Sequence, residues 1–216
     1  MVMSELIGNH IKALVFDFDD TLVGIHLAIW QLHRYIAEEY YGVRLHDSTI
    51  KAHWGRPLQE LARNYYQTDN TEAAIEKMME HQQDFPKQKF EQSEPTIRNL
   101  KLGGKILGIV TATSRPILAN DTKLVGLPLD NFDYIQTAED SEHHKPDARV
   151  FEPMMTWMLK QEVSADNILY VGDGIQDMHA ARTAGLHFIG VTTGLVSSEE
   201  FEAYGARHIP DISALL

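Results

Sequence analysis

Three aspartates follow one short apolar run near the start of the chain, and packing alone does not account for them. Asp17, Asp19 and Asp20 come directly after Ala13-Leu14-Val15-Phe16. Burying one unpaired carboxylate is costly and several repel one another, so a divalent cation held by oxygen ligands is the commonest compensation. Asp17 and Asp19 are two residues apart. On an extended strand they point the same way and could act on one metal and one substrate.

Three further polar segments follow other apolar runs. A hydroxyl and backbone amides before a helix can cradle a phosphate, and a lysine suits a phosphoryl group as a compact charge. A carboxylate at a strand tip and another four residues later lie on one side once a helix begins. Taken alone, each segment also has an ordinary explanation as a helix cap, a solvated loop or a turn. The segments are Thr111-Ala112-Thr113-Ser114, Lys145-Pro146-Asp147 and Gly172-Asp173-Gly174-Ile175-Gln176-Asp177.

Five apolar, β-branched runs predict the strands that would position these segments. Amphipathic stretches separate the last four runs, which favours βα units and a parallel sheet covered by helices on both faces. Open parallel sheets bind ligands at the carboxyl ends of their strands. We therefore expect an α/β fold with a Rossmann-like, doubly wound parallel sheet. The expected strands are Ala13–Phe16, Lys105–Val110, Phe132–Ile135, Ile168–Val171 and His187–Val191.

The long stretch between the first two strands has a different pattern. It shows helical spacing throughout and is rich in Tyr, His, Gln and Met, whereas a simple crossover needs about a dozen residues. We interpret residues 24–94 as an inserted all-helical domain, and residues 1–23 with 95–216 as the catalytic core. Gly24 and Ser93-Glu94-Pro95 are the expected hinges.

Composition excludes several classes of function. The formal net charge is −12, so a nucleic-acid backbone is not an expected partner. The sequence has no cysteine, which rules out disulfides, zinc-thiolate sites and thiol catalysis, and the spacing of the histidines does not form a zinc set. No stretch is long and apolar enough to suggest a membrane span. We expect a cytoplasmic protein.

The four chemical segments, in this order, resemble the motifs of the haloacid dehalogenase-like superfamily, specifically its phosphatases. DFDDTL is similar to the first motif, DxDxT, and VTATSRP to the second. HKPDARVFEP resembles the third, with Ala148 where the family usually has proline, and GDGIQD resembles the fourth, GDxxxD. Four motifs in order, each at a predicted strand end, are poorly explained by chance.

The resemblance implies a Mg²⁺-dependent phosphomonoester hydrolase that forms an aspartyl phosphate. Asp17 would be the nucleophile, and Asp19 the general acid and then the general base. Mg²⁺ would be held by Asp17, by the backbone carbonyl of Asp19 and by Asp173. Asp177 would not bind the ion directly but would contact these ligands and orient them.

The same resemblance assigns the groups that bind the transferred phosphoryl oxygens. Thr111, the backbone amide of Ala112 and Lys145 would offset the negative charge of the transition state. The substrate would be a small phosphorylated metabolite, and the protein would be a monomer or a homodimer.

The helical insertion stands where this superfamily carries its first type of cap, which would exclude water and select the leaving group. The segment Trp54-Gly55-Arg56-Pro57-Leu58-Gln59-Glu60 resembles a cap segment of phosphoglycolate phosphatase and phosphomutase relatives. Arg56 and Lys51 could meet an anionic substrate there, or could be surface cations at an ordinary helix junction. Arg115, beside the second motif, is an equally open case.

Other activities remain alternatives. A phosphomutase of the β-phosphoglucomutase kind would use the same core residues, and a phosphonate hydrolase would need a cap lysine such as Lys51. A haloalkanoate dehalogenase fits less well, because those relatives lack the second acid, Asp19. A non-catalytic binding protein on this scaffold is the further alternative, since a fold does not guarantee an activity.

Overall fold

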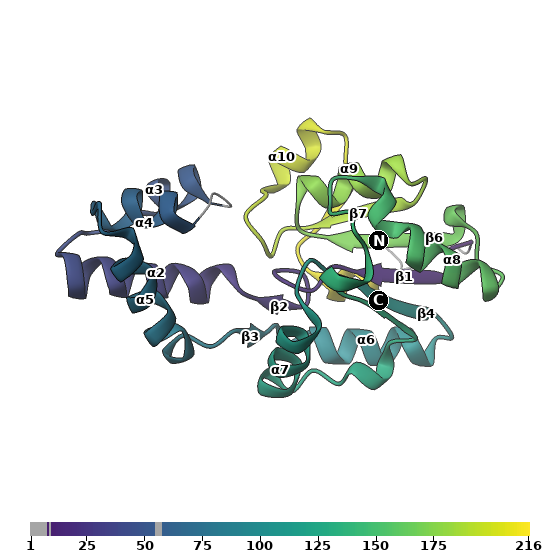
Figure 1. Cartoon of the computed structure of the whole chain (residues 1–216). Helices are drawn as coiled ribbons and strands as arrows, with labels where there is room; N and C mark the ends of the chain where they lie inside the picture. The colour runs from purple at the N-terminus through teal and green to yellow at the C-terminus, as the bar shows by residue number, and fades with distance from the viewer. Residues whose placement is uncertain (1–7, 9, 55–57) are drawn as a thin grey trace. The chain divides into compact units, whose positions relative to one another are not determined.

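The computed structural model describes residues 8, 10–54 and 58–216. The chain divides into two compact units (Figure 1). We call residues 1–24 with 89–216 the sheet unit, and residues 25–88 the helical unit. Two short strands that hydrogen-bond to each other, β2 (Val23–Gly24) and β3 (Gln88–Lys89), lie at the points where the chain passes between the units.

The sheet unit contains a six-stranded sheet in the order β5-β4-β1-β6-β7-β8, and every neighbouring pair is parallel. Taken in chain order within this sheet, the strands follow the 3-2-1-4-5-6 order of a Rossmann-like fold, as predicted. Chain direction across the sheet reverses at β1, so the ligand crevice is expected there. The strands are β1 (Ala13–Phe16), β4 (Ile106–Val110), β5 (Tyr134–Gln136), β6 (Ile168–Gly172), β7 (His187–Val191) and β8 (His208–Ile209).

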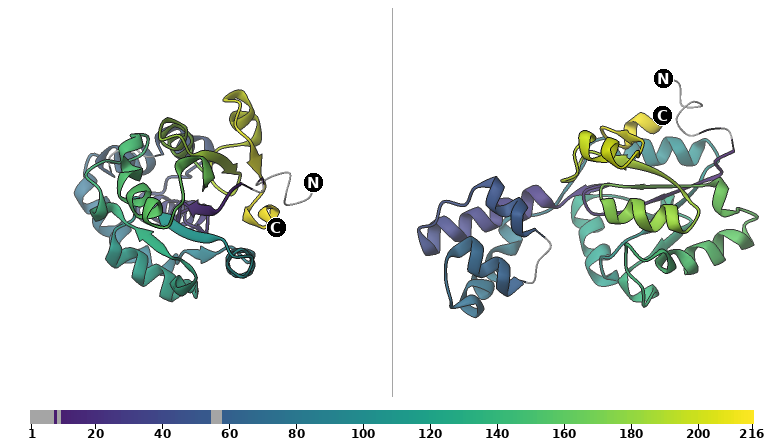
Figure 2. Two further views of the ribbon diagram at one scale, coloured as in Figure 1. Left: turned by 90° about the vertical axis from the view of Figure 1, so that its right-hand side faces the viewer. Right: turned by 90° about the horizontal axis from the view of Figure 1, so that it is seen from above.

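Helices cover both faces of this sheet (Figures 1 and 2). Side chains alternate along a strand, so Leu14 and Phe16 of β1 pack into one apolar cluster, and Ala13 and Val15 into another on the opposite face. The first cluster takes its helical partners from α6 and α7, and the second from α8, α9 and α10. These helices are α6 (Ser93–Leu102), α7 (Arg115–Val125), α8 (Glu152–Lys160), α9 (Ile175–Thr183) and α10 (Ser198–Ala203).

The helical unit is built around one long helix, α2, which buries Trp30, His33, Ile36 and Ala37 at helical spacing. Gly42 ends α2 in the left-handed conformation, with φ 64°, and its amide bonds to the carbonyl of Glu38 at 3.1 Å. The other helices bury fewer residues each. The helices of this unit are α2 (His26–Tyr41), α3 (Asp47–His53), α4 (Leu58–Tyr66) and α5 (Thr71–His81).

The structure corrects four expectations. Strand β8 is an additional sixth strand, and β2 and β3 are strands inside a stretch expected to be helical throughout. The helical unit ends at Gln88 and not at Glu94. Ser93-Glu94-Pro95, expected as a hinge, forms the first turn of α6, where Ser93 is buried and donates to the carbonyl of Leu22 at 2.8 Å. Proline is compatible with a first helical turn, so its presence there does not mark a loop.

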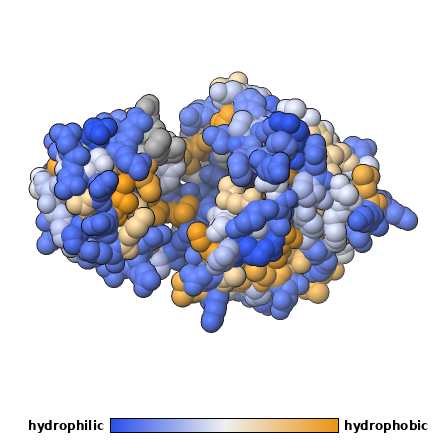
Figure 3. Space-filling view, in the orientation of Figure 1, coloured by the Kyte–Doolittle hydropathy of each residue, from blue (hydrophilic) through white to orange (hydrophobic). Residues whose placement is uncertain are grey.

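Hydrophilic residues dominate the face of the molecule shown in Figure 3, and hydrophobic residues gather there in smaller patches. Within the part of the chain that the structure describes, no helix has the length and apolar character needed to cross a membrane.

Candidate active site

The predicted chemical residues of the sheet unit lie at the carboxyl edge of the sheet. Asp17 follows β1, Thr111 follows β4, and Asp173 follows β6, each by one residue. Asp177 lies in the first turn of α9, directly after the β6 segment. Parallel strands end at the same edge, so residues far apart in the sequence are brought together there.

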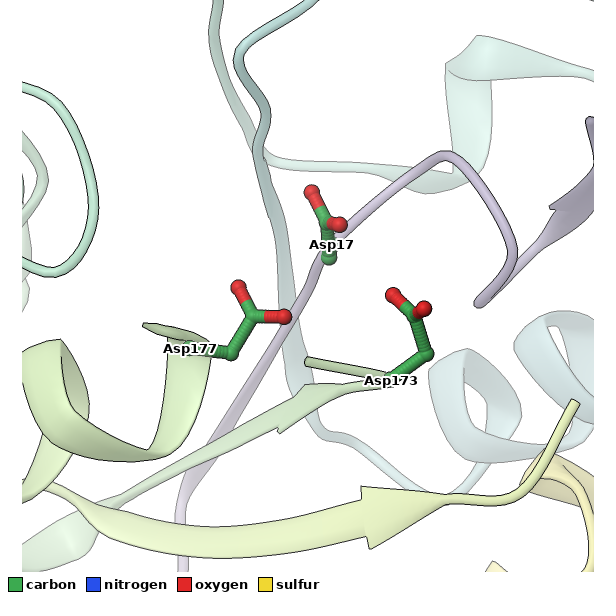
Figure 4. Close-up of side chains that lie close together, drawn as sticks. All are labelled: Asp17, Asp173 and Asp177. Atoms are coloured by element: carbon green, nitrogen blue, oxygen red, sulfur yellow. The ribbon is translucent and has the colours of Figure 1, made fainter. Parts of the chain in front are cut away.

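Three carboxylates form the centre of the site. One oxygen from each of Asp17, Asp173 and Asp177 lies within 4.8 Å of the other two. Figure 4 shows the three side chains converging from the end of β1, the end of β6 and the start of α9. Asp17 and Asp177 are buried, and Asp173 is half-buried. Such a cluster needs positive charge nearby to be stable.

Lys145 supplies one positive charge to this cluster. Its Nζ lies 2.9 Å from Asp17 Oδ1 and 2.6 Å from Asp177 Oδ1. It also donates a hydrogen bond to the hydroxyl of Tyr170 at 3.0 Å. The peptide bond between Lys145 and Pro146 is cis. The lysine of the third motif is therefore part of the carboxylate site and not a solvated loop residue.

Burial and charge both act on the ionisation of this cluster. Burial, assisted by the charges of Asp177 and Asp19 and opposed by Lys145, raises the pKa of Asp17 to about 7. Burial, with the charges of Asp17 and Asp177, raises the pKa of Asp173 to about 9. Burial lowers the pKa of Lys145, but Asp17 and Asp177 outweigh it and raise that pKa well above its ordinary value. One lysine therefore does not fully stabilise three ionised carboxylates, and without a further cation the cluster tends to retain protons near neutral pH.

Two glycines leave the space that the carboxylates occupy. A Cβ on Gly172 would lie 2.7 Å from the carboxyl group of Asp177, and a Cβ on Gly194 would lie 2.0 Å from Asp173 Oδ2. Both distances are below 3.0 Å, so a side chain at either glycine would displace the neighbouring carboxyl group. The amide of Gly174 donates to Asp177 Oδ2 at 2.9 Å. Gly172 and Gly194 thus leave room for the carboxyl groups of Asp177 and Asp173 in their observed positions.

Asp19 contacts the second motif. The hydroxyl of Thr113 donates a hydrogen bond to Asp19 Oδ2. The amide of Thr113 donates in turn to Thr111 Oγ1 at 3.0 Å. Thr111 is buried, whereas Ala112 is exposed, and both line a small pocket of about 10 Å³ together with Lys145. The first, second and third motifs therefore meet at one place.

The start of α7 differs from the predicted phosphate cradle. The amide of Arg115 is not free, because it donates to both carboxylate oxygens of Glu139, at 3.1 and 3.3 Å. The Arg115 guanidinium forms an ion pair with Asp140 at 2.5 Å. A carboxylate already occupies this helix end, so the remaining candidates for binding a phosphate are Thr111, Ala112 and Lys145.

The predicted residues of the insertion are not brought to this site by any described contact. Lys51 is exposed on α3 of the helical unit. Arg56 lies outside the described residues. The structure adds Tyr170, Thr113 and Gly194, to which the sequence assigned no role. A tyrosine inside a buried strand needs a partner for its hydroxyl, and that was the available signal for Tyr170.

Comparison with known proteins identifies the family of the chain. Residues 14–191 match the haloacid dehalogenase-like hydrolase family. A Clostridium perfringens protein assigned as pyrophosphatase PpaX is 29% identical over 188 residues, and the alignment covers 84% of each chain. A Bacteroides fragilis structure assigned as a haloacid dehalogenase-like hydrolase has a TM-score of 0.72 at 28% identity, covering 95% of this chain and 100% of that one. The chain belongs to the haloacid dehalogenase-like hydrolase family, and it is therefore an enzyme of the hydrolase class.

The fold has a second informative neighbour. A Thermotoga maritima structure assigned as a β-phosphoglucomutase has a TM-score of 0.78 at 18% identity, and the alignment covers 95% of this chain and 97% of that one. At this identity the likeness establishes the shared fold, an α/β core of the haloacid dehalogenase type.

Proposed function

We propose that this protein is a Mg²⁺-dependent hydrolase of small phosphomonoesters that transfers the phosphoryl group to Asp17. The main support is the position of the buried Asp17 carboxylate, 2.9 Å from the Lys145 ammonium at the carboxyl edge of a Rossmann-like sheet. A carboxylate held in place by a fixed cation is an oriented nucleophile, and the same cation suits the oxygens of a phosphoryl group.

The donor set fits Mg²⁺. When all three carboxylates are ionised, one ammonium leaves two negative charges, which one divalent cation would neutralise. Both oxygens of Asp177 already accept hydrogen bonds, from Lys145 and from the amide of Gly174. Asp17, Asp173 and the backbone carbonyl of Asp19 would therefore hold the ion, and Asp177 would orient Lys145. When bound, Mg²⁺ would offset the charge of the transferred phosphoryl oxygens.

The residues divide the proposed reaction between them. Asp17 attacks phosphorus while the bond from phosphorus to the leaving oxygen breaks, and Asp19 gives a proton to that oxygen. In the second half, Asp19 takes a proton from the water that hydrolyses the aspartyl phosphate. The Thr113 hydroxyl keeps the Asp19 carboxyl group in place between these steps. Lys145, Thr111 and the amide of Ala112 bind the phosphoryl oxygens throughout.

The helical unit would serve as the cap that selects the leaving group. It is a compact unit inserted after β1, where the superfamily carries such a domain. Lys51 is exposed on α3 and is available to an anionic substrate. Arg56 stays a sequence-based candidate, because it lies outside the described residues.

The decisive experiment is phosphate release from p-nitrophenyl phosphate and a panel of small phosphomonoesters, with Mg²⁺ and with EDTA. Inorganic pyrophosphate belongs in the panel, because the relative at 29% identity is assigned as a pyrophosphatase. Release that requires Mg²⁺ and is absent from the Asp17→Asn protein would support the proposal and rank the substrates. The exposed variant Lys160→Met serves as a control for handling and folding.

Two outcomes would replace the proposal. Conversion of a sugar phosphate to its isomer, without net phosphate release, would identify a phosphomutase acting through the same residues. Binding of Mg²⁺ without turnover of any phosphoester, in a folded protein, would favour a non-catalytic role.

A further inference from the structure

Tyr170 stands in the middle of β6 and is completely buried. Its ring packs edge-on against Phe151, with the ring centroids 4.8 Å apart. A buried tyrosine hydroxyl requires hydrogen-bond partners, and a phenylalanine would fill the same apolar space without that requirement. The presence of the hydroxyl therefore calls for an explanation beyond packing.

The hydroxyl joins three elements of the site. It accepts a hydrogen bond from Lys145 Nζ at 3.0 Å and donates to the backbone carbonyl of Val110 at 3.0 Å. Asp177 Oδ1 is a second, longer acceptor at 3.3 Å. Val110 is the last residue of β4 and directly precedes Thr111. One side chain thus connects the strand of the second motif to the lysine of the third and the carboxylate of the fourth.

The same contact completes the hydrogen bonding of Lys145. A lysine ammonium has three N–H groups, and here the acceptors are Asp17 Oδ1, Asp177 Oδ1 and the Tyr170 hydroxyl. Two of these acceptors are charged and belong to the carboxylate cluster. The third is neutral, and the backbone carbonyl of Val110 at the end of β4, on the other side of β1 in the sheet, holds it in place. Two carboxylates alone would leave the ammonium free to shift between them, and the third contact defines a single position.

We infer that Tyr170 is a positioning residue, which holds the Lys145 ammonium in line with Asp17 so that it meets the transferred phosphoryl group. This inference rests on the proposed phosphatase function. Tyr170 would not touch the substrate; it would act through Lys145. Because charge on the phosphoryl oxygens is rearranged in the transition state, misplacing Lys145 should weaken binding of a transition-state analogue more than binding of the product phosphate.

The test compares Tyr170→Phe with Tyr134→Phe. Tyr134 stands in β5, is half-buried, and its hydroxyl contacts Gln136 at 3.3 Å, so the same atom is removed away from Lys145. For Tyr170→Phe we expect kcat/KM to fall about tenfold and the inhibition constant of vanadate to rise about tenfold, with that of phosphate changing by less than about threefold. Tyr134→Phe should change each quantity by less than about twofold. Inhibition constants do not depend on the fraction of folded enzyme.

Equal vanadate inhibition in the two variants, with both folded, would overturn the positioning role. If Tyr170→Phe does not fold, 3-fluorotyrosine at position 170 keeps the size of the ring and weakens the hydroxyl as an acceptor. The vanadate constant should then rise by about two- to threefold, and an unchanged constant would again overturn the inference.

A crystal structure of Tyr170→Phe separates this inference from the proposed function. Displacement of Lys145 Nζ from Asp17, relative to the wild-type crystal structure, would support positioning even if the wild-type enzyme releases no phosphate. An unmoved Nζ would overturn positioning even if the wild-type enzyme is an active phosphatase.

Discussion

Each unit buries a group of interacting polar side chains, and the two groups differ in charge. In the sheet unit the buried polar groups of the site are charged, with Lys145 between Asp17 and Asp177. In the helical unit, buried His33 bonds to the hydroxyl of Tyr66 at 2.6 Å, and burial lowers the pKa of His33 to about 4, so this pair is neutral near pH 7. Burying a neutral polar group costs less free energy than burying a charged one. Buried charged groups are therefore found mainly at functional sites. The comparison supports the proposal that the chemistry belongs to the sheet unit.

The largest effect should come from removing one charge of the sheet unit without changing shape. Asp17→Asn is expected to lower phosphate release by at least about 10⁴-fold, because an amide cannot act as the nucleophile. The substitution keeps the volume of the side chain, so the cooperative thermal transition should persist. Phosphate release at more than a trace level would contradict the assignment of Asp17 as the nucleophile. It would also weaken the contrast between a charged, reactive site in the sheet unit and a neutral buried pair in the helical unit.

Removing the cation should instead destabilise the sheet unit. Lys145→Met leaves Asp17 and Asp177 without their ammonium partner, and the free energy of unfolding should fall by about 3 kcal/mol. Urea denaturation measures this, with Lys160→Met as the exposed control. Added Mg²⁺ should restore part of the loss in Lys145→Met, because a cation again faces the carboxylates. A loss equal to that of Lys160→Met would show that the carboxylates do not need the lysine.

The helical unit should respond to pH through His33. Its pKa is about 4 in the folded state against 6.5 as the ordinary value, so between these values the unfolded chain binds more protons. Stability should therefore fall as the pH drops from 6.5 to 4, by about 3 kcal/mol, and then level off. His33→Gln should remove this dependence, whereas the exposed control His46→Gln should retain it.

Tryptophan fluorescence can follow this transition in one unit. Trp30 and Trp54 belong to the helical unit, and Trp157 to α8 of the sheet unit. In a Trp157→Phe background the remaining signal reports on residues 25–88. A stability curve that stays flat between pH 6.5 and 4 would contradict the neutral burial of His33.

The smallest effect is expected at Lys51. Lys51→Ala should change the hydrolysis of p-nitrophenyl phosphate by less than about twofold, because the residue is exposed in the helical unit and is not one of the groups proposed to bind the phosphoryl oxygens. Its effect should appear as a change of preference among larger phosphomonoesters. Steady-state kcat/KM values for each phosphomonoester of the panel test this. Equal losses on all substrates would show that Lys51 contributes to folding or to the core site.

The centre of the sheet was predictable because its strands are short, apolar and bounded by polar segments. β1 spans Ala13–Phe16 as expected, and the parallel, Rossmann-like order was confirmed. β8, at His208–Ile209, is only two residues long, and two residues show no periodicity. The end of the insertion was misplaced because Ser93-Glu94-Pro95 has the composition of a turn, although a helix can begin with it.

The site was partly predictable for the same reason. Topology alone brings the ends of β1, β4 and β6 together, so the meeting of Asp17, Thr111 and Asp173 follows from the fold. The contact of Gly194 with Asp173 depends on how the loop after β7 approaches β6, which no local pattern encodes. The roles of the site residues stay predictions until the variants are measured.

The pairing of β2 with β3 has a consequence for how this protein can vary over generations. The two strands hydrogen-bond to each other, so the exit at Gly24 and the return at Lys89 are neighbours. A segment whose two ends meet can be lengthened, shortened or exchanged by recombination without stretching the sheet that it leaves. Residues 25–88 can therefore change in sequence and length during evolution while the residues of the carboxylate site stay the same.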